Sequence, residues 1–207
     1  MHCTDVGLEG IYHFPVVGRV DRIVAEVKEF LTGARTPVAA DRVLATLLFA
    51  EIVDSTSRAA ELGDSRWRKL LESFYGLAQR LVKRFRGVEV ESKGNRVFAR
   101  FDGPARAVAC ACAIRDGVQG LGLEVRAGLH TGEIELLEDN VTGVAVHIGV
   151  SVAAHAGRSE VLVSRTVKDL VVGSGIEFID RGIHEFDGVS DAWQVYAVAG
   201  EAARQQN

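Results

Sequence analysis

Residues 42–56 read RVLATLLFAEIVDST, and the interpretation of the whole chain starts from this stretch. Residues 43–50 form a near-continuous apolar run of strand length, which is typical of a central strand covered on both faces. The run ends at Glu51, and the polar residues that follow it mark a turn. We therefore expect a buried central strand that leads directly into a turn.

Beyond this strand the chain alternates between helical and strand patterns. Helices are predicted over residues 57–85, 104–118 and 143–156, with a helical turn over 165–171. Strands are predicted over residues 88–93, 97–101, 123–130, 133–136, 161–164, 176–186 and 193–198. Gly94-Asn95 between the first two is a hairpin signal. This order predicts an α+β sandwich with helices packed on a mainly antiparallel sheet.

Composition places the chain among ordered soluble domains. It has 207 residues, 47% of them hydrophobic and 25% charged, which is enough for one sizeable domain and an appendage. A formal net charge of −4 does not favour a nucleic-acid or an anionic-membrane partner. Residues 1–10 lack a signal-peptide pattern, and the apolar run 43–50 is too short to span a bilayer. We expect a cytoplasmic protein.

Several segments, in sequence order, resemble the catalytic domain of class III adenylate and guanylate cyclases of the actinobacterial type. The family's first strand and turn, its strand–hairpin–strand–helix, its R-x-G-[IL]-H-x-G-E strand, its N-x-A-x-R helix and its closing strands are similar to residues 42–56, 88–116, 125–136, 143–157 and 181–198. The resemblance implies a class III nucleotidyl cyclase fold, a ferredoxin-like sandwich, over residues 42–199.

The resemblance also implies a reaction and a metal site. In the family the 3′-hydroxyl of a nucleoside triphosphate attacks its own α-phosphate, with two Mg or Mn ions held by two carboxylates. The metal positions correspond to Glu51, Ile52 and Asn95. Glu51 keeps the charge on a longer side chain, whereas Asn95 has none. Asp54, where glycine is common, adds negative charge beside the triphosphate turn. We expect the two-ion site to be weakened or lost.

The remaining positions that the resemblance assigns have also changed. The family's transition-state asparagine and arginine correspond to His147 and Ser151, and a lysine near the closing hairpin corresponds to Asp187. The base-selecting positions correspond to Glu91 and Asn140. A glutamate at position 91 suits guanine, while drift in an unused pocket explains it equally simply, and we favour drift.

The N-terminal part follows a different pattern. Residues 1–35 contain a helical apolar stripe over 20–31, and residues 36–41 form a linker. Residues 11–33 resemble the last loop and helix of an α/β-hydrolase, with His13 as its histidine. The chain has no G-x-S-x-G nucleophile motif, so we reject hydrolase activity and interpret the segment as a remnant. Residues 200–207 are a tail.

Three functions remain from the sequence. The first is a pseudo-cyclase in cyclic nucleotide signalling, a homodimer that binds ATP or GTP with negligible turnover. The second is a slow Mn-dependent enzyme that uses Glu51 to form cyclic AMP or cyclic GMP. The third is a structural partner that associates with a separate cyclase-type protein. Asn95 combined with Ser151 favours the first, and nucleotide binding distinguishes the third from the other two.

Overall fold

The computed structural model describes residues 41–137 and 140–200. The chain divides into two units, Met1–Ala40 and Asp41–Asn207, and the described residues all belong to the second. The predictions for residues 1–35, including His13, and for the tail beyond Gly200 lie outside the described residues. Asp41, which we assigned to the linker, is the first residue of a strand.

The described residues form one mixed sheet with helices on both of its faces. The sheet order is β2-β3-β1-β4-β6-β8-β7, and β5 pairs with β4. The strands are β1 Asp41–Ile52, β2 Val88–Lys93, β3 Arg96–Phe101, β4 Val125–Leu137, β5 Asn140–Thr142, β6 Val161–Ser164, β7 Phe178–Glu185 and β8 Ala192–Val198. All neighbouring pairs are antiparallel except β4–β6, which is parallel. The mainly antiparallel α+β fold is therefore confirmed.

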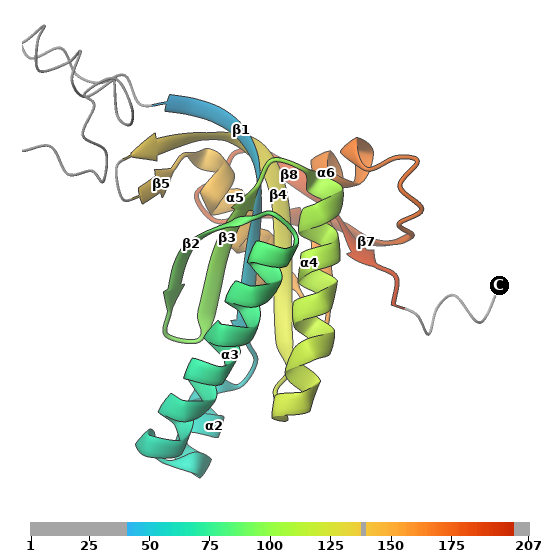
Figure 1. The fold of residues 1–207 in the computed structure, drawn as a ribbon. Helices are drawn as coiled ribbons and strands as arrows, with labels where there is room; N and C mark the ends of the chain where they lie inside the picture. The colour runs from blue at the N-terminus through green and yellow to red at the C-terminus, as the bar shows by residue number, and fades with distance from the viewer. Residues whose placement is uncertain (1–40, 138–139, 201–207) are drawn as a thin grey trace, which may run out of the picture. The chain divides into compact units, whose positions relative to one another are not determined.

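Helices cover the two faces unequally, as Figure 1 shows. The helices are α2 Ser55–Leu62, α3 Asp64–Arg84, α4 Pro104–Gly117, α5 Val144–His155 and α6 Arg165–Leu170, with a 3₁₀ turn η1 at Val118–Leu121. Leu48 and Phe74 belong to the core between the sheet and α3 and α4, whereas Leu47 packs on the opposite face with Ala153 of α5. No helix in the described ranges is long and apolar enough to cross a membrane.

The central strand is β1, as its apolar run predicts. It pairs with β3 on one side and with β4 on the other. Leu47 and Leu48 point to opposite faces of the sheet and are both fully buried. Because both faces are covered, an alternating pattern of apolar and polar residues would have left polar groups in the core.

Glycines account for two boundaries that the sequence predicted wrongly. The single helix expected over residues 57–85 is two helices, α2 and α3, separated by Gly63 with a φ of 73°. The strands expected over 123–130 and 133–136 are one continuous strand, β4. The glycines of β4 accommodate α5, since an ideal Cβ on Gly128 would lie 2.1 Å from the backbone nitrogen of Ala153. Strand β5 was not predicted.

This contact yields a stability prediction. Gly128→Ala forces α5 away from β4, because the new methyl group meets backbone atoms that cannot rotate aside, and we expect a loss of about 3 kcal/mol. Gly120→Ala is the control: nothing lies within 4 Å of its ideal Cβ, and we expect a change within about 0.5 kcal/mol. Urea unfolding followed by circular dichroism measures both, and equal midpoints would contradict the close-packing argument.

Candidate functional site

The end of β1 and the β2–β3 hairpin bring together the three positions that the resemblance assigns to metal. Asn95 Nδ2 donates hydrogen bonds to Glu51 Oε1 at 3.0 Å and to the Ile52 carbonyl oxygen at 3.1 Å. The Ile52 backbone N–H donates to the Asn95 carbonyl oxygen at 2.9 Å. This contact follows from the strand register, in which Glu51 is opposite Arg96, the residue after Asn95.

The second oxygen of Glu51 is bound by an arginine from β4. Arg126 is opposite Glu51 in the β1–β4 register, and its Nε and Nη2 donate to Glu51 Oε2 at 3.2 and 2.9 Å. Its Nη1 donates to the Ala154 carbonyl oxygen at 3.2 Å. Burial raises the pKa of the Glu51 carboxyl, but hydrogen bonds from Arg126 and Asn95 and the charges of Arg126 and Arg96 outweigh burial. The net result is a pKa below the ordinary value, so Glu51 is an ionised carboxylate with both oxygens engaged.

The sequence alone does not identify Arg126 as a site residue, although Arg126 lies in the segment that resembles the R-x-G-[IL]-H-x-G-E strand. The signal that identifies it is the pairing of β1 with β4, which places Arg126 across from Glu51. The two residues are 75 positions apart, and no local pattern in either segment reports the register. The pairing of these two strands is a feature of the tertiary structure, which the sequence does not report.

Asp54 also has a cationic partner. It is the N-cap residue of α2, with a φ of 53° that explains why glycine suits this position. Its carboxylate is bonded to Arg158, whose Nη1 donates to Glu124 Oε2 at 3.0 Å. Hydrogen bonds from Arg158 to Glu124 and Asp54 raise the pKa of the Arg158 guanidinium. The negative charge expected at position 54 is therefore paired within the same chain.

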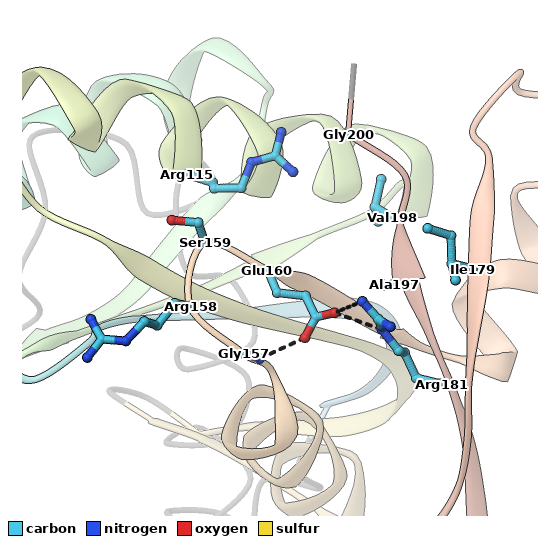
Figure 2. Close-up of a pocket in the computed structure, with 10 residues that line it drawn as sticks. All are labelled: Arg115, Gly157, Arg158, Ser159, Glu160, Ile179, Arg181, Ala197, Val198 and Gly200. Carbon is cyan, nitrogen blue, oxygen red and sulfur yellow. Dashed lines mark hydrogen bonds and ion pairs between the residues drawn. The ribbon is translucent and has the colours of Figure 1, made fainter. Parts of the chain in front are cut away.

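Arg158 also lines a cavity of about 570 Å³ that is shown in Figure 2. Its guanidinium points away from Arg181 in that view, and Arg181 Nε donates to Glu160 Oε1 at 2.8 Å. The other oxygen of Glu160 accepts the Gly157 N–H at 2.7 Å. Arg115, the third arginine, contacts Asp116 at 2.7 Å. The arginines around this cavity are thus engaged by carboxylates of the protein itself.

The other predicted site residues are on β2, β5, α5 and the segment between β7 and β8. His147 is exposed and Ser151 half-buried on α5, Glu91 is exposed on β2, and Asp187 is exposed between β7 and β8. Asn140 is the first residue of β5 and pairs with Leu137. The hydrogen bonds of Glu51 in the described part of the chain reach none of these five residues. Within the described residues, hydrogen bonds therefore join the metal positions to one another, and Arg126 links Glu51 to Ala154 on α5.

His130, which lies in the same strand as Arg126, is buried with 4% of its surface exposed. Its Nδ1 is 2.8 Å from Ser164 Oγ, and its ring stands edge-on to Trp193 with 5.4 Å between the centroids. Burial lowers the pKa of His130 to about 4. The ring is therefore neutral at pH 7, and this histidine is not a free cation for phosphate.

Sheet order and helix placement are those of the class III nucleotidyl cyclase fold, and solved structures of cyclase domains share this fold. An adenylyl cyclase of P. aeruginosa, CyaB, has a TM-score of 0.73 at 21% identity, over 78% of this chain and 96% of that chain. The guanylate cyclase domain of RhGC from Catenaria anguillulae, in complex with GTP, has a TM-score of 0.70 at 18% identity, over 78% and 99%. A dimeric guanylyl cyclase domain of RhoGC from Blastocladiella emersonii has 0.70 at 17%, over 78% and 99%.

Two curated proteins named as cyclases are similar to the chain in sequence. The uridylate cyclase of Rhodovulum sp. (strain MB263) is 26% identical over 179 residues, 72% of this chain and 72% of that protein. A protein of Rhizobium meliloti (strain 1021) provisionally named adenylate cyclase 3 is 28% identical over 135 residues, 60% of this chain but only 22% of that protein. No protein-family model matches the chain. The resemblance to class III adenylate/guanylate cyclase domains that the sequence predicts is confirmed.

The low pKa of His130 makes stability depend on pH. The unfolded chain takes up the His130 proton as pH falls below about 6.5, whereas the folded chain resists it down to about 4, so the native state loses stability across this interval. Between pH 7.5 and 5.0 the loss amounts to about 2 kcal/mol. His130→Gln removes the titration, so urea unfolding of this variant should show a smaller fall by that amount. Parallel pH profiles for both proteins would contradict the shifted pKa.

Proposed function

We propose that this chain is a class III cyclase homologue that binds a nucleoside triphosphate as a homodimer and has little or no cyclase activity. The observation that carries the proposal is the state of Glu51. Its two carboxylate oxygens accept hydrogen bonds from Asn95 and Arg126, at 3.0 Å and at 2.9 Å. The guanidinium of Arg126 thus binds the carboxylate that a divalent ion would need as its ligand.

The residues present do not fit a two-ion site. Asn95 directs its amide nitrogen at two acceptors, Glu51 Oε1 and the Ile52 carbonyl oxygen. Turning the amide over would set its oxygen against both of these oxygens, so the observed orientation is the favourable one and presents a donor where a metal needs a ligand. In residues 41–137 and 140–200 no group of three or more His, Cys, Asp or Glu side chains could hold a metal ion.

Phosphate stabilisation is weakened as well. Ser151 is short and neutral where the family resemblance expects an arginine, and Asp187 is an exposed negative charge where it expects a lysine. An arginine that contacts the transition state is worth on the order of 10³–10⁵ in rate in other phosphoryl-transfer systems. Losing that contact together with one of the two metal carboxylates supports negligible turnover over slow Mn-dependent catalysis.

Arg126 supplies a cation for nucleotide binding. Arg126 is 32% exposed, and of the five N–H donors of its guanidinium, Nε, one on Nη2 and one on Nη1 are used by Glu51 and Ala154. Two N–H groups remain for the oxygens of a phosphate. The solved relative that holds GTP and the curated relative named for uridylate both support a triphosphate ligand. Glu91 keeps guanine among the candidate bases.

A second copy of the chain would complete the site. The described domain gathers Glu51, Ile52 and Asn95 at one place and carries His147 and Ser151 on α5, and no hydrogen bond within residues 41–137 and 140–200 joins these two residues to Glu51. The dimeric relative supports assembly of two such domains. Association with a different cyclase-type protein is the second candidate, and it is favoured only where the purified chain binds no nucleotide.

Restoring the changed residues tests catalysis. The natural protein with Mn²⁺ and ATP, GTP or UTP should form no cyclic nucleotide above a blank without protein, measured by chromatography. Glu51→Asp, Asn95→Asp and Ser151→Arg together should give product, because they shorten the first carboxylate, return the second and return a guanidinium. A matched control with Glu61→Asp, Ser73→Arg and Gln79→Glu, all exposed on α2 and α3, should stay silent. Turnover by the natural protein would overturn the proposed loss of activity.

Binding without catalysis is tested in EDTA, where no divalent ion takes part. Isothermal titration calorimetry should show the natural protein binding at least one of ATP, GTP and UTP. Arg126→Met should weaken that binding about tenfold, since it removes roughly 1.4 kcal/mol of charge-assisted hydrogen bonding. Arg165→Met, at an exposed arginine on α6 that pairs with Asp169, should leave it unchanged. Absence of binding would favour the structural-partner function.

A further inference from the structure

A second cavity, of about 420 Å³, lies between β4, the start of α5 and the start of β1. Its lining includes His130, Gly132, Gly143, Val144, Ile148 and Arg42. His130, which lines the cavity, is opposite Leu47 in the β1–β4 register, and Leu47 is four residues, or about 13 Å, from Glu51 along β1. The cavity lining contains none of Glu51, Asn95, Arg126, His147 and Ser151, although Ile148 follows His147 directly on α5.

His130 presents an unpartnered nitrogen at this cavity. Its Nδ1 is bonded to Ser164 Oγ, while its Nε2 has no hydrogen-bond partner within residues 41–137 and 140–200. The Nε2 edge lies over Gly132, because an ideal Cβ on Gly132 would be 3.1 Å from Nε2 and 2.8 Å from the Cβ of Ala145. Any larger residue at position 132 would fill the space beside the ring. His130 is 4% exposed and lines the cavity, so a ligand in this space lies within reach of its unpaired nitrogen.

The N-terminus of α5 faces the same cavity. Gly143 is the N-cap residue and supplies no side-chain hydrogen bond, and it lines the cavity together with Val144 and Ala145. The amides of Val144 and Ala145 carry partial positive charge at this end of the helix, whereas the Val146 N–H already donates to the Gly143 carbonyl oxygen at 3.1 Å. When Ser164 Oγ donates to Nδ1, the ring proton of His130 is on Nε2. The cavity then offers hydrogen-bond donors from His130 and from the start of α5. A ligand that binds both must supply an acceptor atom.

The charged residues and the apolar walls of the cavity restrict the chemical class of the ligand that carries this acceptor atom. Arg42 at the rim pairs with Glu135 at 2.7 Å and with Glu133 at 3.8 Å, so one cation stands against two carboxylates. This balance disfavours a carboxylate or a phosphate as the ligand. Ile134, Ala145 and Ile148 form apolar walls and are each no more than 4% exposed.

We propose that this cavity binds a small uncharged molecule with a carbonyl oxygen at one end and an apolar body. The oxygen accepts from His130 Nε2 and from the first amides of α5, and the body packs on Ile134 and Ile148. A volume of about 420 Å³ is within the usual range for small-molecule sites. This site does not depend on nucleotide binding or on cyclase activity.

The test uses benzamide as the probe, which combines an uncharged carbonyl with an apolar ring. Long-range ¹H–¹⁵N NMR of the histidine side chains of the full chain reports on His130 Nε2. Benzamide should shift this resonance saturably, with a Kd on the order of 1 mM for so small a ligand. Benzoate, its charged analogue, and benzene, which has no acceptor, should bind at least tenfold more weakly. Equal binding of benzoate, or no shift with benzamide, would overturn the proposal.

Two substitutions separate this cavity from other binding sites. Val144→Trp places a bulky ring at the mouth, where Val144 is 65% exposed and folding is not at stake, and it should abolish the benzamide shift. Val172→Trp, at a position 82% exposed and outside the cavity lining, is the matched control and should leave the shift intact. Gly132→Ala should reduce binding by filling the space beside Nε2. A shift that persists unchanged in Val144→Trp would refute the assigned site.

Discussion

The register of β1 between its two neighbours is the constraint on which the rest of the domain depends. Leu47 and Leu48 face opposite layers, so a slip of one residue would exchange the side chains that pack on α5 for those that pack on α3 and α4. The same register continues to the end of the strand. There it sets Glu51 opposite Arg96 on β3 and Arg126 on β4. Core packing and site electrostatics are therefore consequences of a single alignment.

That alignment also determines which groups surround Glu51. A divalent ion is a mobile cation that arrives with its nucleotide, whereas Arg126 is a cation that the fold holds in place. Its bond to Glu51 Oε2 keeps the carboxyl ionised and engaged in the absence of ligand. Asp54 is matched by Arg158 in the same way. The fold of the class is retained while the cations around these carboxylates belong to the protein, and fold alone therefore does not establish activity.

Helix α5 packs on the sheet so closely that only glycine fits at the points of contact. Gly128 leaves no room for a side chain beneath Ala153, and Gly149 leaves none above Phe49. The helix is held at a fixed distance as a result. Its exposed face carries His147, while its first residues line the cavity beside His130. A ligand in that cavity would contact the element that also carries the transition-state positions.

The sequence by itself determined the fold class, nearly all of the elements and the identity of the changed positions. An apolar run such as residues 43–50 and a hairpin signal such as Gly94-Asn95 are local, so they can be interpreted without knowing what they pack against. Boundaries at Gly63 and Gly132 could not be placed, because a glycine interrupts a helix in one case and admits a neighbouring helix in the other. Only the tertiary contacts distinguish these two uses.

The tertiary structure alone decided how the changed positions interact. Glu51 and Asn95 were both identified from the sequence, but their hydrogen bond, and the two bonds from Arg126 to the same carboxylate, join residues 44 and 75 positions apart. The open space beside His130 likewise arises where β4, α5 and β1 meet. Sequence patterns report the chemistry that each residue can perform. Strand register and helix packing decide which partner each residue meets, because those distances are set by the folded chain as a whole.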